Sequence, residues 1–107
     1  MARRILEITH HELQMVLFPV GEDIREVVRV TLFGPSFPER AVEPEIVAGG
    51  TIARRVSIAP DQRSIQGFFS ELPAEGAEIL VRYGDSQQGA SPLPFSRSGV
   101  RPLPKHC

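Results

Sequence analysis

A chain of 107 residues, 41% of them hydrophobic, is the size of one domain with one modest core. Its formal net charge of −1, with 12 basic and 13 acidic residues, excludes a broadly basic surface for nucleic acid or an anionic membrane. The single cysteine excludes a fold built on intramolecular disulfides.

The first twenty residues predict strands rather than a targeting or membrane segment. Residues 3–9 alternate, with Leu6 and Ile8 on one face, which predicts an edge strand. Residues 13–18 predict a second short strand, or a continuation of the first after a bulge, and residues 19–23 have turn composition. The pattern leaves open whether residues 10–20 belong to the domain or form an interaction segment.

Polar residues at positions 10–12 break this apolar run. No stretch reaches the length of a signal-peptide core or the ~20 apolar residues of a membrane helix. We therefore expect a cytoplasmic protein with no membrane association.

The best strand pattern covers residues 25–33, which are rich in β-branched side chains. Val28, Val30 and Leu32 share one face and predict a core-facing set. Gly34-Pro35 ends the strand, and Phe37 follows in a loop, where an aromatic side chain is expected to plug one end of a sandwich.

Further strands are predicted at residues 42–48, 51–58, 63–69 and 77–83. Pro44 indicates an edge position for the first of these, because proline has no N–H for a ladder, and Gly49-Gly50 predicts a hairpin turn. The expected inward-facing residues are Ile52, Val56, Ile58, Ile65, Gly67, Phe69, Ile79, Val81 and Tyr83.

The C-terminal part is rich in proline. Residues 87–91 have the composition of a polar loop, Leu93, Phe95 and Val100 offer one last strand, and an extended tail covers residues 101–107. The turn signals, at spacings of roughly 8–12 residues, predict an all-β fold: one immunoglobulin-like antiparallel β-sandwich of about seven strands over residues 1–100.

The central stretch, residues 27–86, resembles the IPT/TIG family of immunoglobulin-like domains. Residues 30–37, VTLFGPSF, are similar to the strand and turn written "vtItGxnF" in that family. Residues 44–50, 65–76 and 77–83 follow its later strands and turns, whereas the lead-in before residue 27 departs from the family pattern. The resemblance implies a sandwich fold and a binding or spacer role, and it carries over no catalytic residue.

Histidine and cysteine residues are the candidates for metal or nucleophilic chemistry. His10 and His11 point to opposite faces of a strand, so they cannot easily share one ion with Glu12. His106 and Cys107 are zinc-ligand types, but a site would need the tail to fold back onto His10 or His11. We expect no metal or cofactor, and we expect Cys107 to be exposed, with an intermolecular disulfide as the alternative and a catalytic role as the weakest one.

Charged side chains give no catalytic constellation. Four carboxylates lie in predicted turns: Asp61, Glu71, Glu75 and Asp85. Turn chemistry already favours aspartate at positions 61 and 85. The arginines considered for an anion-binding patch are Arg54, Arg55, Arg82, Arg97 and Arg101. A solvated sheet face is the commoner meaning of such arginines, and no aromatic residues alternate with them to stack on bases.

These observations favour a non-catalytic protein-binding or assembly module. The tail is expected to dock on a partner through Phe95, Val100, Arg101 and Leu103, and edge strands allow self-association. A carbohydrate-binding accessory domain is the alternative, although the chain has no tryptophan and one tyrosine to stack on a sugar. An enzyme that uses Cys107 or the histidines is a third, weaker hypothesis.

Overall fold

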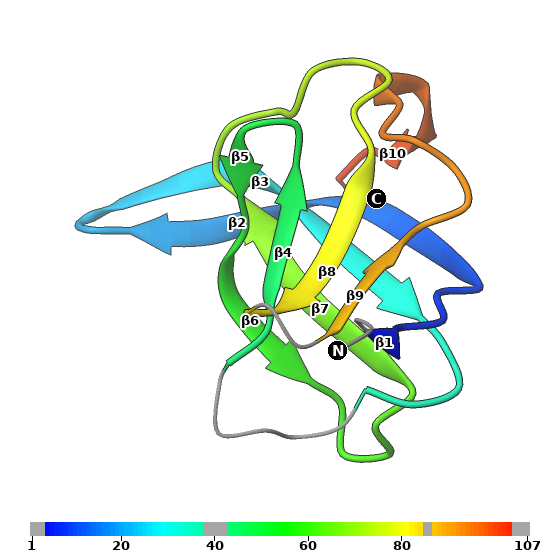
Figure 1. Ribbon diagram of the computed structural model, residues 1–107. Coiled ribbons are helices and arrows are strands. Elements are labelled where there is room, and N and C mark those ends of the chain that lie inside the picture. Colours follow the sequence, from blue (N-terminus) through cyan, green and yellow to red (C-terminus); the bar gives the residue numbers. More distant parts are fainter. Residues whose placement is uncertain (1–3, 38–42, 85–86, 104–107) are drawn as a thin grey trace.

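The computed structural model describes residues 4–37, 43–84 and 87–103 and forms two β-sheets packed face to face (Figure 1). One sheet has the order β1 (Arg4–Ile5), β9 (Gln87–Ala90), β8 (Ile79–Tyr83), β4 (Glu45–Ala48) and β5 (Thr51–Ile52). The other has the order β10 (Val100–Arg101), β2 (His10–Val20), β3 (Asp23–Phe33), β7 (Ser64–Phe69) and β6 (Arg54–Ile58). Neighbouring strands are antiparallel, except that β1 runs parallel to β9 and β10 parallel to β2. The prediction of an all-β sandwich is confirmed.

The number of strands exceeds the seven that were expected. The described part of the chain contains ten strands and one 3₁₀ turn at Arg97–Gly99. Three of the strands, β1, β5 and β10, are only two residues long, and β5 and β6 divide one predicted strand between them. No helix in this part is long and apolar enough to cross a membrane.

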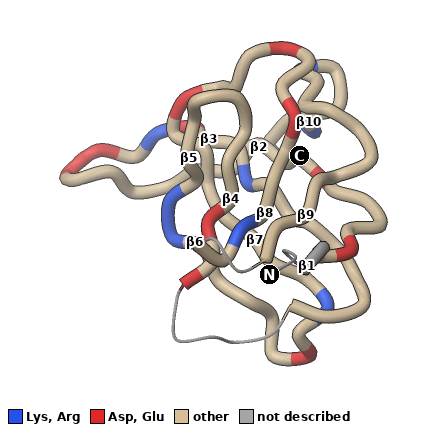
Figure 2. The backbone as a smooth tube through the Cα atoms, in the orientation of Figure 1, with Lys and Arg blue, Asp and Glu red and all other residues tan. Residues whose placement is uncertain are grey.

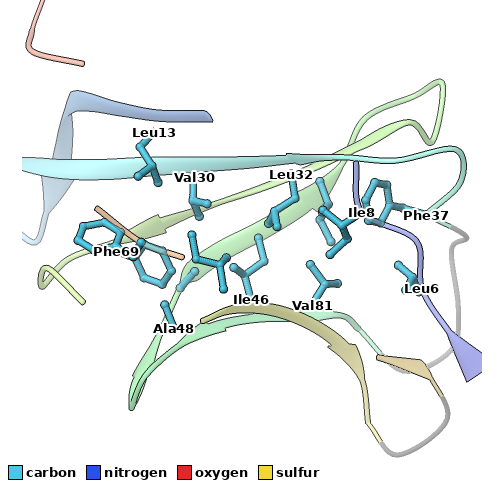
Figure 3. Close-up of a cluster of buried hydrophobic side chains, with 14 of the residues drawn as sticks. Leu6, Ile8, Leu13, Val30, Leu32, Phe37, Ile46, Ala48, Phe69 and Val81 are labelled. Carbon is cyan, nitrogen blue, oxygen red and sulfur yellow. The ribbon is translucent and has the colours of Figure 1, made fainter. Parts of the chain in front are cut away.

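The core lies between the two sheets and follows the predicted alternation (Figure 3). Along β3, Val28, Val30 and Leu32 are buried in the core cluster. Val30 and Leu32 face the buried residues of the opposite sheet. Alternate residues of β7 and β8 are buried as predicted: Ile65, Gly67, Phe69, Ile79, Val81 and Tyr83. Period-two alternation on half-buried strands therefore identified these three strands correctly.

Phe37 closes one end of the core, as its place after Gly34-Pro35 predicted. Its side chain is fully buried, and its backbone N–H donates to the carbonyl of Gln62 at 2.7 Å. Gly34 lets the ring approach, because a Cβ at this position would collide with the backbone carbonyl of Glu7 and lie 3.2 Å from the Phe37 ring.

The predicted strand 51–58 is wrong as a single element. The chain leaves one sheet after β5 and joins the other at β6, with Ala53 between them and its N–H donating to the carbonyl of Ile46 at 2.8 Å. The switch turns Ile52 outward, where 54% of it is exposed, and buries Ala53 instead. The edge position inferred from Pro44 is also wrong, because β4 lies between β8 and β5 and Pro44 precedes the strand.

The predicted polar loop at residues 87–91 is wrong as well, because most of it forms β9 between β1 and β8. Gly89 permits this pairing, since a Cβ there would collide with the backbone of Leu6. Similarly, the polar residues at positions 10–12 do not interrupt a strand but begin β2. Polar composition was a poor guide at both places because one face of each strand is exposed to solvent.

Candidate docking surface

The β2–β3 hairpin extends beyond the rest of its sheet (Figure 1). All eleven residues of β2 pair with β3, but β7 pairs with β3 only from Val28 to Phe33, and β10 pairs with β2 only at Leu13 and Gln14. Residues 16–27 therefore form a two-stranded ribbon that has no neighbouring strand on either side, and we call it the arm. Residues 10–20 thus begin within the sheet and end in the arm.

A tight turn ends the arm. Val20 pairs with Asp23 across the two-residue loop Gly21-Glu22, and Gly21 has a φ of +64°. A left-handed first residue followed by a residue with negative φ is the pattern of a type II′ turn, whose twist matches that of a hairpin. The turn expected at residues 19–23 is thus present but shorter, because Pro19 and Val20 belong to β2 and Asp23 to β3.

A small aromatic cluster supports the outer face of the arm, the face turned away from the core. The rings of Phe18 and Phe68 have centroids 4.6 Å apart, and the Arg55 guanidinium carbon lies 5.1 Å from the Phe18 centroid. Val27, which lies between these two positions in the register, is only 3% exposed. Isolated hairpins are marginal in water, so this cluster accounts for the extended form of the arm.

The inner face of the arm is mostly apolar, and its residues near the tip are exposed. Leu17 and Ile24 are 60% and 70% exposed, and the register places Pro19 opposite Ile24 and Glu26 opposite Leu17. The tip of the arm carries the acidic residues Glu22 and Asp23, and the basic Arg25 follows two positions later in the chain (Figure 2). Exposed apolar side chains on a projecting strand pair are typical of a surface that contacts another protein.

A second surface feature is a cleft of about 240 Å³ beside β10. Its lining residues are His11, Glu12, Leu13, Leu93, Pro94, Ser96, Gly99 and Arg101. His11 Nδ1 hydrogen-bonds to Ser91 Oγ at 2.5 Å, and burial, together with the neighbouring His10, lowers the pKa of His11. Ser91 itself is buried and does not line the cleft, so the pair does not present a nucleophile to a substrate there.

The cleft also lacks what a carbohydrate site needs. Neither phenylalanine nor tyrosine is among its lining residues, and the single tyrosine of the chain, Tyr83, is buried in the core. A flat exposed ring for stacking on a sugar is therefore missing from this cleft.

The structure separates the four predicted partner contacts. Phe95 is fully buried in the core, and its backbone bonds to Gly76 and Ala77, so the folded domain does not offer this side chain to a partner. The expectation that Phe95 contacts a partner is wrong for the folded domain, because an apolar residue between prolines can be a core anchor as readily as a surface contact. Val100 and Arg101 form β10, while Leu103 is partly buried.

The boundary predicted after residue 100 falls inside β10. Val100 pairs with Leu13, and the Gln14 side chain donates to the carbonyl of Pro102 at 2.9 Å. The beginning of the predicted tail is therefore an edge strand of the sandwich.

The histidines and metal candidates are also separated. His10 stacks on Phe33, with centroids 4.4 Å apart, whereas His11 turns toward Ser91, which confirms that the two rings occupy opposite faces. Among the described residues, no group of three or more side chains could hold a metal ion, and His106 and Cys107 lie outside those residues.

The carboxylates in turns form local bonds where the structure describes them. Asp61 accepts the N–H of Arg63 at 3.0 Å, and Glu75 accepts the N–H of Arg97 at 2.9 Å, which lowers the pKa of Glu75. Asp85 lies outside the described residues, and the exposed Glu71 forms no hydrogen bond or ion pair with any described residue.

Two of the arginines that could have formed an anion-binding patch have other contacts. Arg82 forms an ion pair with Glu45 at 3.0 Å across β4 and β8, while Arg55 covers Phe18 at the base of the arm.

Comparisons of this chain with protein-family models, with curated proteins and with solved structures found no match.

Proposed function

We propose that this chain is a non-catalytic protein-binding or assembly module that docks through its arm. The observation that carries the proposal is the pair of exposed apolar side chains, Leu17 and Ile24, on a ribbon with unpaired edges. Folded domains usually shorten, cover or charge such edges, and a long open ribbon costs stability unless a partner uses it.

We further propose that the sandwich is of the immunoglobulin-like type, which the IPT/TIG resemblance implies. The sheet order supports this assignment: β2-β3-β7-β6 corresponds to the A-B-E-D sheet and β9-β8-β4 to the G-F-C sheet of an immunoglobulin domain. Domains of this architecture serve many functions, so the docking role depends on the arm and not on the fold.

The test is capture of partners from the native lysate by the tagged full chain, read by mass spectrometry. The double variant Leu17→Ser/Ile24→Ser should lose the captured partner, whereas Ile52→Ser, which changes another exposed apolar side chain, on β5, should retain it. A partner that the arm variant retains would contradict docking through the arm. If truncation after Gly99 removes that partner instead, the docking residues are Val100, Arg101 and Leu103.

A further inference from the structure

The β3 edge of the arm has unpaired backbone groups. In a two-residue hairpin, the residues that flank the turn bond to each other, so Asp23, Arg25 and Val27 direct their backbone groups toward β2. The intervening residues, Ile24 and Glu26, direct theirs to the opposite side. Gly34 fits this alternation, because its N–H donates to the carbonyl of Arg63 at 3.1 Å, on the β7 side.

The other edge of the hairpin is less available. β10 pairs with β2 at Leu13 and Gln14, and Pro19 has no N–H to donate. The edge of β3 at residues 23–27 is therefore the better template for an added strand.

The side chains along this edge are complementary to a second copy of themselves. Asp23 and Arg25 lie on the outer face, and neither forms an ion pair within the described residues. Between them, Ile24 lies on the inner face and is 70% exposed. The sequence Asp-Ile-Arg thus places an apolar residue between opposite charges.

We propose that two copies of this chain associate by antiparallel pairing of their β3 edges, with Ile24 of one copy opposite Ile24 of the other. A twofold axis perpendicular to the sheet keeps equivalent faces on the same side. In this register, Asp23 of each copy lies opposite Arg25 of the second copy. The Ile24 pair exchanges two backbone hydrogen bonds, and the charged pairs occupy the closer, non-hydrogen-bonded positions.

Neighbouring registers are less favourable. Centring the pair on Arg25 or on Asp23 loses both Asp23–Arg25 attractions and places like charges opposite each other at the centre of the pairing, which is destabilising. The register centred on Ile24 also places Glu26 opposite Glu22, at the exposed ends of the pairing. Because one strand edge buries far less than the about 800 Å² per partner of a stable complex, we expect a reversible dimer at high protein concentration.

This inference rests on the arm being the docking surface, and it names the partner as a second copy. The test is sedimentation equilibrium of the full chain over a range of concentrations. Asp23→Arg alone and Arg25→Asp alone should each weaken dimerisation at least about tenfold, because attraction becomes repulsion in both charged pairs. An equimolar mixture of the two variants should recover the dimer, since every cation then faces an anion across the interface. The double variant Asp23→Arg/Arg25→Asp should also dimerise.

Glu71→Arg provides the control, because it makes the same charge change at an exposed residue outside the arm and should leave the dimer unchanged. A chain that is monomeric at all concentrations, single variants that still dimerise, or a mixture that stays monomeric would each overturn the pairing. A monomeric chain whose lysate partner is lost with Leu17→Ser/Ile24→Ser would overturn self-association alone and leave docking through the arm intact.

Discussion

Single residues decide where the two sheets of this sandwich can close. Gly89 lies in β9 at a point where the backbone of Leu6 passes too close for any side chain, and Gly67 lies where a Cβ would be 2.9 Å from the Cβ of Ala53. Both glycines occur within strands, where glycine is otherwise unfavourable. Close approach of another segment explains their presence.

Gly89→Ala should therefore lower the free energy of unfolding by about 1–3 kcal/mol, the range for overpacking in a closed site. The contacting atoms belong to the backbone of Leu6, so a change of rotamer cannot relieve the collision. Urea denaturation provides the measurement. Gly50→Ala is the control, since a Cβ there meets nothing within 4 Å, and it should change stability by less than about 0.5 kcal/mol.

His11 makes the stability of the domain depend on pH. Burial and the neighbouring His10 lower its pKa below the ordinary 6.5, so the unfolded chain takes up a proton at higher pH than the folded chain does. Stability is therefore lost as the pH falls below 6.5 toward the lowered value. The urea midpoint should fall between about pH 7.5 and about pH 5.5, and His11→Gln should reduce that fall. An equal fall in this variant would show that His11 is not responsible.

At the scale of elements, the arm depends on contacts at its base. Phe18→Ala removes the ring contact with Phe68 and the stacking of Arg55, which are together worth about 1–2 kcal/mol. The amides that bond across the arm, at positions 16, 18, 20, 23, 25 and 27, should then exchange hydrogen about 5- to 30-fold faster, while amides of the core strand β8 should not change. Val20→Ala, near the tip, serves as the control. Uniform acceleration in every strand would mean that the ring supports the whole domain rather than the arm.

The sequence was most informative for strands with one buried face and least informative at their ends. Val28, Val30 and Leu32 alternate in the way that β3 requires, and Phe37 was correctly identified as a buried plug. Leu17 and Ile24 show the same alternation, yet they are exposed, because the opposite sheet ends before it reaches them. Alternation indicates which residues share a face and gives no information on what covers that face. The arm could not be separated from the core for this reason.

At the scale of the whole molecule, the arm makes the domain elongated. The radius of gyration is 14.0 Å and the extents are 52 × 28 × 25 Å. A compact domain of this length is expected to have a radius of about 13 Å. The core cluster contains no described residue between positions 16 and 27, so the sandwich below the arm is complete without it.

Shortening the arm should consequently change the shape of the protein more than its stability. Deleting Leu17, Phe18, Arg25 and Glu26 removes two cross-strand pairs and preserves both the turn and the inward–outward alternation. The radius of gyration, measured by small-angle scattering, should fall toward about 13 Å, and the free energy of unfolding should drop by no more than about 2 kcal/mol. Deleting only Phe18 and Arg25 is the matched comparison, because removal of one pair reverses the faces of the tip. Loss of folding in the four-residue deletion would show that the arm is an integral part of the sandwich, whereas a folded, shorter protein that no longer associates would separate docking from stability.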